Sequence, residues 1–319
     1  MNGPIPDFTA LRVTSLTWEA DDVLSMVLED PHTQLPPWTP GSHIDIQLTP
    51  TLIRQYSLCG PADAAYWRVA VLREPNGNGG SAHVHDVLRP GAIVNVRGPR
   101  NHFELHDAPA YVFIAGGIGI TPILAMVRDA ERRGIPWSLA YGGRRRDSMA
   151  FLSELAGFDD RVSLHPGDET GLMPLDQILA ARPATSLIYC CGPPPLIQAV
   201  QERCPAQDKE RLHVERFIAA PDSHVEHSAD EPGFTLVLNR TGKEFEVRPG
   251  VSILETLEQS GMEHPNSCRE GICGTCETTV LEGDLDHRDS LLEDDERAAG
   301  DTMLICVSRC LSKRLVLDL

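Results

Sequence analysis

The sequence predicts a multidomain protein of three parts: an antiparallel β-barrel, an α/β domain with a parallel sheet, and a small α+β domain. Three observations predict this order. Apolar and polar residues alternate in the first hundred positions, strand-like and helix-like stretches alternate in the second hundred, and five of the nine cysteines lie between residues 268 and 310. A length of 319 residues also favours two or three domains over one.

The charge balance excludes two classes of partner. The chain has 28 Lys and Arg against 46 Asp and Glu, and the net charge of -18 repels phosphate backbones and anionic lipid surfaces. We expect no nucleic-acid binding and no membrane association, because the longest uncharged run, residues 111–127, is broken by glycines and a proline. No secretory leader is visible, and nine cysteines without one indicate a reducing compartment, which predicts a cytoplasmic location.

The first domain is predicted to span residues 1–105. Apolar and polar side chains alternate in several short stretches, as they do in half-buried antiparallel strands. Such strands at close spacing are typical of a small closed barrel. The alternating apolar residues are Leu24, Met26, Leu28, Ile44, Ile46, Leu48, Val94 and Val96.

The second domain is predicted to span residues 106–220. Residues 111–115 are continuously apolar, as in a parallel strand buried on both faces. Further strands are predicted at 137–141, 161–165, 186–190 and 212–217, with helices at 148–156, 174–181 and 194–203. This alternation is typical of a doubly wound α/β domain. Residues 221–233 are polar and without periodicity, which predicts an interdomain linker.

The third domain is predicted to span residues 234–319, with a hairpin at 234–238 and 243–247 and a helix at 252–259. Four cysteines follow in the pattern C-x4-C-x2-C and, after 29 further residues, C. A wide gap, a tight pair and a distant fourth thiolate suit a loop that wraps two irons. A zinc site is the alternative, but structural zinc sites prefer paired short spacings.

Residues 268–276, Cys-Arg-Glu-Gly-Ile-Cys-Gly-Thr-Cys, resemble the cluster loop of plant-type ferredoxins. The resemblance covers about residues 234 to 319 and implies a β-grasp fold with a [2Fe-2S] cluster. The ligands it implies are Cys268, Cys273, Cys276 and Cys306. Cys310 lies outside the pattern and is interpreted as a free thiol.

A glycine-rich turn, Gly116-Gly117-Ile118-Gly119-Ile120-Thr121-Pro122, stands between a predicted buried strand and a predicted helix. Glycines there let the backbone approach a pyrophosphate, and the start of a helix supplies free amides. The turn differs from G-x-G-x-x-G, so a Rossmann dehydrogenase is not the best match. By itself such a turn could also serve only close packing.

Two further motifs accompany this turn: Arg54-Gln55-Tyr56-Ser57 before it, and Cys191-Gly192-Pro193 after it at the end of a late strand. The three motifs together resemble the ferredoxin reductase superfamily of flavin enzymes. The resemblance implies that Arg54 binds the flavin phosphate, Tyr56 lies on the flavin ring and Ser57 hydrogen-bonds it. It also implies a nicotinamide dinucleotide site made of Gly116, Gly117, Gly119, Thr121, Pro122, Cys191, Gly192 and Pro193.

The domain order narrows the resemblance to reductase components of Rieske-type aromatic oxygenases, the phthalate dioxygenase, vanillate demethylase and phenoxybenzoate dioxygenase reductase family. In this family Gly79, Gly80 and Ser81 are expected at the flavin phosphate, and Phe217 over the flavin face. The resemblance implies FMN, with FAD as the alternative, and NADH as the electron donor. The residues of Arg144-Arg145-Arg146-Asp147 leave the donor open, because arginines suit a 2′-phosphate and an aspartate suits a 2′-hydroxyl.

The implied function is electron transfer from NADH through FMN and the cluster to a Rieske aromatic-ring dioxygenase or O-demethylase. No catalytic acid or base is expected, since hydride passes directly to the flavin. Two alternatives remain at this point: an FAD-containing reductase of a haem or diiron monooxygenase, and a non-enzymatic ferredoxin-type electron carrier. A monomer is expected, because a shuttle must expose its cluster.

Overall fold

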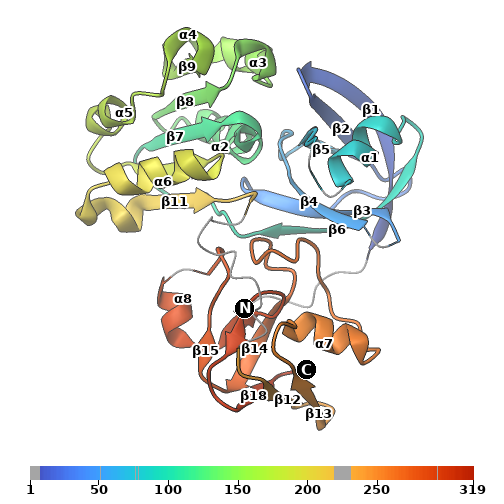
Figure 1. Cartoon of the computed structure of the whole chain (residues 1–319). Coiled ribbons are helices and arrows are strands. Elements are labelled where there is room, and N and C mark those ends of the chain that lie inside the picture. Colours follow the sequence, from blue (N-terminus) through green and yellow to red (C-terminus); the bar gives the residue numbers. More distant parts are fainter. Residues whose placement is uncertain (1–7, 51, 76, 78, 219–230, 293) are drawn as a thin grey trace. The chain divides into compact units, whose positions relative to one another are not determined.

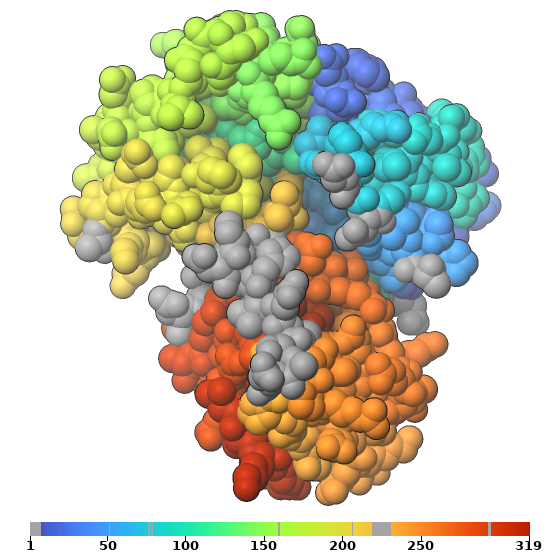
Figure 2. Space-filling model, in the orientation of Figure 1, coloured from blue at the N-terminus to red at the C-terminus, as the bar shows by residue number. Residues whose placement is uncertain are grey.

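The computed structural model describes all residues except 1–7, 51, 76, 78, 219–230 and 293 (Figure 1). The chain divides into two compact units, Met1–Phe217 and Ile218–Leu319. In the space-filling view each unit is closely packed, with the first coloured blue to yellow and the second orange to red (Figure 2). Most of the predicted linker, residues 221–230, lies outside the described residues. Within the described part of the chain, no helix is both long enough and apolar enough to cross a bilayer.

The first unit begins with six antiparallel strands in the order β4-β3-β6-β1-β2-β5. Leu58, just after β4, bridges Val69 of β5, so the two outer strands meet and the barrel closes. The predicted alternation is confirmed: of its eight apolar residues, seven are buried and Leu24 is half-buried. The elements are β1 (Thr9–Ala20), β2 (Val23–Glu29), β3 (Ser42–Thr49), β4 (Leu52–Ser57), β5 (Trp67–Leu72), α1 (Gly80–Asp86) and β6 (Ile93–Asn101).

The rest of the first unit is a parallel sheet in the order β11-β10-β7-β8-β9. The chain runs outward from β7 to β9 and then returns to place β10 on the other side of β7. This reversal creates a switch point at the carboxyl ends of β7 and β10, where open α/β sheets bind ligands. The strands are β7 (Tyr111–Gly116), β8 (Trp137–Gly143), β9 (Val162–Pro166), β10 (Leu187–Cys191) and β11 (Leu212–Glu215).

Helices cover this sheet, and β7 is buried along its whole length. The predicted helices at 174–181 and 194–203 are confirmed, whereas the one at 148–156 is wrong: the region holds a short 3-10 turn and one helical turn. Phe151 there has a φ of 62°, which a continuous helix does not allow. The helical segments are η1 (Gly117–Gly119), α2 (Ile120–Arg133), η2 (Arg146–Ser148), α3 (Leu152–Leu155), η3 (Ala156–Arg161), α4 (Gly167–Thr170), α5 (Leu175–Ala181), α6 (Pro194–Arg203) and η4 (Ala206–Arg211).

The last predicted strand of the second domain, residues 212–217, is shorter than expected. It ends at Glu215, because its neighbour β10 ends at Cys191 and offers no partner beyond that point. Phe217 therefore follows the strand rather than belonging to it. Its side chain is half-buried against the core of the first unit.

The second unit is a mixed sheet in the order β13-β12-β18-β14-β16, in which β12 and β18 run parallel. The predicted hairpin is confirmed with the same bounds, and helix α7 begins one residue after the expected start. Ser252 caps this helix: its hydroxyl accepts the amide of Glu255 at 3.1 Å. The elements are β12 (Phe234–Leu238), β13 (Lys243–Val247), α7 (Ile253–Gln259), β14 (Glu277–Glu282), β15 (Leu285–Asp286), α8 (Asp294–Ala299), β16 (Thr302–Leu304), β17 (Arg309–Cys310) and β18 (Arg314–Leu317).

Candidate functional site

Four cysteine thiols meet in the second unit. The thiol of Cys268 lies beside those of Cys273 and Cys306, and the thiol of Cys306 lies beside that of Cys276. Cys268 is half-buried and the other three are buried. Among the described residues, no three His, Cys, Asp or Glu side chains surround one point as the ligands of a single ion do. A binuclear cluster needs no such group, because each of its two irons takes two thiolates.

The backbone of the cysteine loop turns through angles that favour glycine. Gly271 and Gly274 have φ angles of 69° and 67°. A Cβ atom on Gly271 would also lie 2.6 Å from Cγ2 of Val307. The amide of Glu270 donates to Sγ of Cys268 at 3.3 Å, and amide hydrogen bonds of this kind stabilise thiolate ligands. The loop therefore fits an iron-sulfur cluster.

Contacts on two sides hold this loop in place. Arg269, itself at a φ of 60°, donates to Glu258 of α7 at 2.5 Å. Asp289 is buried next to Gly271, and its carboxylate accepts the amide of Leu292 at 2.8 Å. The loop is thus attached on one side to helix α7 and on the other to the backbone next to Asp289, where the amide of Ser290 donates to the carbonyl of Gly271 at 2.9 Å.

The glycine turn of the first unit packs directly against the end of β10. A Cβ atom on Gly119 would lie 2.3 Å from the carbonyl oxygen of Cys191, and one on Gly192 would lie 3.0 Å from the amide nitrogen of Gly116. These neighbours are backbone atoms, which cannot swing aside as a side chain can. The fold therefore brings the two predicted motifs together at the switch point and requires glycine where they touch.

Of the remaining residues of the turn, Thr121 and Pro122 pack into the start of α2, whereas Gly117 borders open space. Thr121 is buried, and its hydroxyl donates to the carbonyl of Ile118 at 3.0 Å. Pro122 stands in the first turn of α2, where its missing amide hydrogen costs no helical bond. Gly117 has a φ of 54°, and a Cβ atom there would meet nothing within 4 Å. This open side of the turn can admit a phosphate to the backbone amides.

The sequence did not predict a contact between the thiol of Cys191, at the end of β10, and the carboxyl of Glu215, at the end of β11. Cys191 and Glu215 are register partners, and Sγ of Cys191 lies 3.8 Å from Oε2 of Glu215. Burial raises the pKa of Glu215 to about 8 and raises the pKa of the Cys191 thiol. The only signal in the sequence was that Cys191 directly follows one predicted strand and Glu215 lies in the second half of another. Parallel pairing of those strands makes them neighbours.

The predicted flavin residues lie on β4. Arg54 and Tyr56 point to one face of the strand and Ser57 to the other, because strand side chains alternate. Ser57 is buried, and burial also raises the pKa of Tyr56, which keeps the phenol neutral. A Cβ atom on Gly80 would lie 2.6 Å from Cγ of Arg54. Arg54 and the Gly79-Gly80-Ser81 turn are therefore neighbours, although one lies on a strand and the other opens a helix.

The Gly79-Gly80-Ser81 turn has accessible backbone next to the guanidinium group of Arg54. Gly79 has a φ of 81° and a Cβ atom there would meet nothing within 4 Å, whereas the Ser81 hydroxyl oxygen accepts the amide of Glu74 at 3.0 Å. An arginine beside an open glycine backbone suits a phosphate group, which takes both charge and amide donors. The arrangement fits the phosphate end of a flavin mononucleotide.

The basic turn after β8 is already paired with carboxylates. Arg145 lies 3.3 Å from Asp21, and Arg146 makes two bonds to Glu169 at 2.9 and 2.7 Å. Two of the three arginines that could have held a 2′-phosphate are therefore engaged within the protein.

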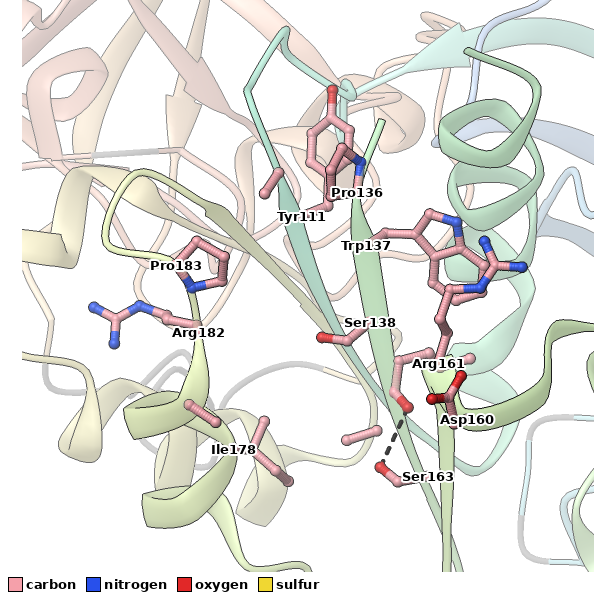
Figure 3. Close-up of a pocket in the computed structure, with 14 residues that line it drawn as sticks. Tyr111, Pro136, Trp137, Ser138, Asp160, Arg161, Ser163, Ile178, Arg182 and Pro183 are labelled. Atoms are coloured by element: carbon pink, nitrogen blue, oxygen red, sulfur yellow. Dashed lines mark hydrogen bonds between the residues drawn. The ribbon is translucent and has the colours of Figure 1, made fainter. Parts of the chain in front are cut away.

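A cavity of about 380 Å³ lies elsewhere on the parallel sheet (Figure 3). Tyr111 and Trp137, which line it, are the first residues of β7 and β8, and Ser163 and Arg182 also belong to its lining (Figure 3). The cavity is thus at the amino ends of the strands, opposite the glycine turn. Because α/β sheets bind nucleotides at the carboxyl ends, this cavity is not part of the candidate site.

Known protein families match both parts of the site. The 2Fe-2S iron-sulfur cluster binding domain matches residues 236–311, and the oxidoreductase NAD-binding domain matches residues 113–202. Phenoxybenzoate dioxygenase subunit beta of Ectopseudomonas oleovorans is 45% identical over 315 residues, which cover 97% of each chain. The chain belongs to the family of oxygenase reductase components. This reductase is accordingly an oxidoreductase with a [2Fe-2S] domain and an NAD-binding domain.

Two solved structures match the reductase over 98% of its length. One is phthalate dioxygenase reductase, a modular structure for electron transfer from pyridine nucleotides to [2Fe-2S]. It is 35% identical in sequence, 98% of its chain is covered, and the TM-score is 0.72. The other is an intact type IV self-sufficient cytochrome P450 monooxygenase, which is 41% identical with a TM-score of 0.88. The reductase spans only 41% of that P450 chain. The predicted family and fold class are confirmed.

Proposed function

We propose that this reductase takes electrons from NADH through a bound FMN and delivers them one at a time, through a [2Fe-2S] cluster, to a Rieske-type aromatic-ring dioxygenase or O-demethylase. The observation that carries the proposal is the contact of Gly119 with Cys191 at the switch point, in a chain that also gathers four thiols. A flavin supplies the step between them, because it accepts two electrons as hydride and releases them singly.

In this proposal the chain's own residues bind and orient the flavin, the nucleotide and the cluster. Arg54, with the Gly79-Gly80-Ser81 turn, holds the flavin phosphate, while Tyr56, Ser57 and Phe217 contact the ring. The nucleotide site consists of Gly116, Gly117, Gly119, Thr121, Pro122, Cys191, Gly192 and Pro193, and the cluster ligands are Cys268, Cys273, Cys276 and Cys306. None of these residues has to act as an acid or base.

NADH is the proposed donor rather than NADPH. The ion pairs of Arg145 with Asp21 and of Arg146 with Glu169 support this choice, since the neighbouring carboxylates offset the positive charge that a 2′-phosphate would need. FMN is proposed over FAD because the reductase family that the sequence resembles uses FMN, and the turn beside Arg54 would hold its single phosphate. We also propose domains at 1–105, 106–220 and 234–319 joined by a linker at 221–233, and a cytoplasmic monomer.

A haem monooxygenase is the second candidate acceptor. Its support is the 41% identity between this chain and the type IV self-sufficient cytochrome P450, a chain much longer than the reductase. Electron transfer to a purified Rieske oxygenase and to a purified cytochrome P450, measured side by side, distinguishes the two candidates. The proposal predicts much faster reduction of the Rieske protein.

An anaerobic titration tests the cofactor chain. The as-isolated protein is titrated with NADH and, separately, NADPH, while visible absorption reports the flavin and electron paramagnetic resonance reports the cluster. We expect NADH to bleach the flavin and produce the reduced-cluster signal, NADPH to do so only at far higher concentration, and the released flavin to be FMN. A bleached flavin with a silent cluster would contradict the electron path.

A further inference from the structure

A chain of charged side chains joins the barrel to the parallel sheet inside the first unit. Arg68 of β5 lies 2.6 Å from Glu19 of β1 and 2.7 Å from Glu154 of α3. Arg128 of α2 pairs with the other carboxylate oxygen of Glu154 and also donates to the backbone carbonyl of Cys59. Glu154 therefore stands between an arginine of the barrel and an arginine of the α/β layer.

These groups are largely withdrawn from water. The side chains of Arg68 and Arg128 are 15% and 23% exposed, and that of Glu154 is 30% exposed. The guanidinium of Arg68 also lies 4.8 Å from the centre of the Phe151 ring. Exposed ion pairs contribute little to stability, whereas removal of one partner from a partly buried pair leaves the other charge poorly compensated.

The network touches the two elements that carry the proposed flavin and nucleotide sites. Cys59 follows Ser57 by two residues, so the carbonyl that Arg128 holds belongs to the continuation of the flavin strand. Arg128 lies on α2, the helix that begins directly after the glycine turn. One side chain thus links the strand of one site to the helix of the other.

We propose that Arg128 and Glu154 are positioning residues that fix the distance between the flavin strand and the glycine turn, and so the distance over which hydride moves. This inference rests on the proposed function. Hydride transfer requires donor and acceptor atoms within about 3.5 Å, and a misplacement of about 1 Å can slow such a reaction by about 100-fold. Loosening the link therefore slows hydride transfer without removing either cofactor site.

The test uses the full-length holoprotein and the variant Arg128→Gln. In anaerobic stopped-flow experiments with saturating NADH, we expect flavin reduction at least ten times slower than in the wild type. Flavin content, the dissociation constant for NADH and the rate of electron transfer from flavin to cluster should stay within about twofold. The matched control is Arg132→Gln on the same helix, whose side chain is 69% exposed and pairs with Asp129 one turn away. It should leave flavin reduction unchanged.

A second variant separates positioning from stability. In the single variant the carboxylates of Glu19 and Glu154 must share Arg68. The Arg128→Gln/Glu154→Gln double variant leaves Arg68 and Glu19 as a balanced pair, so its melting temperature should rise above that of the single variant. Hydride transfer should stay slow, and the long-wavelength charge-transfer absorbance between NADH and flavin should stay weak. Wild-type hydride transfer in a folded, flavin-loaded Arg128→Gln variant would overturn the inference. Failure of NADH to reduce the wild-type flavin would instead overturn the proposed function.

Discussion

Glu215 shows how one residue acquires a property that its type alone does not confer. A glutamate on a short strand is ordinarily ionised, but here its carboxyl faces the buried thiol of Cys191 at 3.8 Å. Burial, which disfavours the charged form, raises its pKa to about 8. A neutral carboxyl beside the proposed nicotinamide site leaves the redox centre free of an extra negative charge at neutral pH.

This shift predicts a pH-dependent stability that Glu215→Gln removes. The folded protein keeps a proton that the unfolded chain releases above the ordinary glutamate pKa of about 4.5, so the stabilisation is complete below pH 4.5 and declines as the pH rises to about 8. The contribution should fall by at most about 1.4 kcal/mol per pH unit in that range. Melting temperatures of both proteins at pH 5, 6, 7 and 8 test this: the difference between wild type and variant should change with pH, and parallel curves would contradict it.

At the scale of elements, the strand-turn-helix unit from β7 to α2 is shaped by contact with the end of β10. Its glycines are not interchangeable. Gly117 borders open space, whereas Gly119 touches the backbone of Cys191. The turn therefore has one side for packing and one side for a ligand.

This difference predicts that Gly119→Ala damages the nucleotide site. The added methyl would lie 2.3 Å from the carbonyl oxygen of Cys191, so β10 or the turn must shift. We expect kcat/KM for NADH, measured with ferricyanide as acceptor, to fall at least tenfold. Gly157→Ala is the matched control, because a Cβ atom there meets nothing within 4 Å, and its kcat/KM should stay within about twofold. Equal activity in both variants would show that the contact does not matter for NADH.

At the scale of the whole molecule, the chain separates its chemistry between two units. Met1–Phe217 contains the proposed flavin and nucleotide sites, and Ile218–Leu319 contains the thiol loop. Each unit has its own hydrophobic core, so a substitution in the cysteine loop need not disturb the fold of the first unit.

The division predicts that Cys276→Ser separates two activities. We expect NADH-dependent reduction of cytochrome c, which requires the cluster, to fall to a few per cent, while reduction of ferricyanide by the flavin stays within about twofold. Cys310→Ser is the control, since Cys310 lies outside the ligand spacing and its thiol contacts Ser312 at 3.1 Å. Loss of both activities in a folded, flavin-loaded Cys276→Ser variant would refute the division.

Much of this molecule follows from local sequence. The continuous apolar run at β7, the hairpin of β12 and β13 and the cysteine spacing depend on neighbours in the chain, and their predictions are confirmed. The region 148–156 was mispredicted because the positive φ of Phe151 reflects its buried surroundings rather than its residue type.

By itself, the sequence determined the order of the three folds and the residue types of the candidate sites, because periodicity, glycine turns and thiol spacing are local properties. Only the tertiary structure decided which distant residues meet: Gly119 with Cys191, Arg54 with Gly80, and Arg128 with Cys59. It also decided that Arg145 and Arg146 pair with carboxylates and that the half-buried Glu215 lies beside a buried thiol. Partners and pKa values depend on burial and on long-range strand pairing, which no local pattern contains.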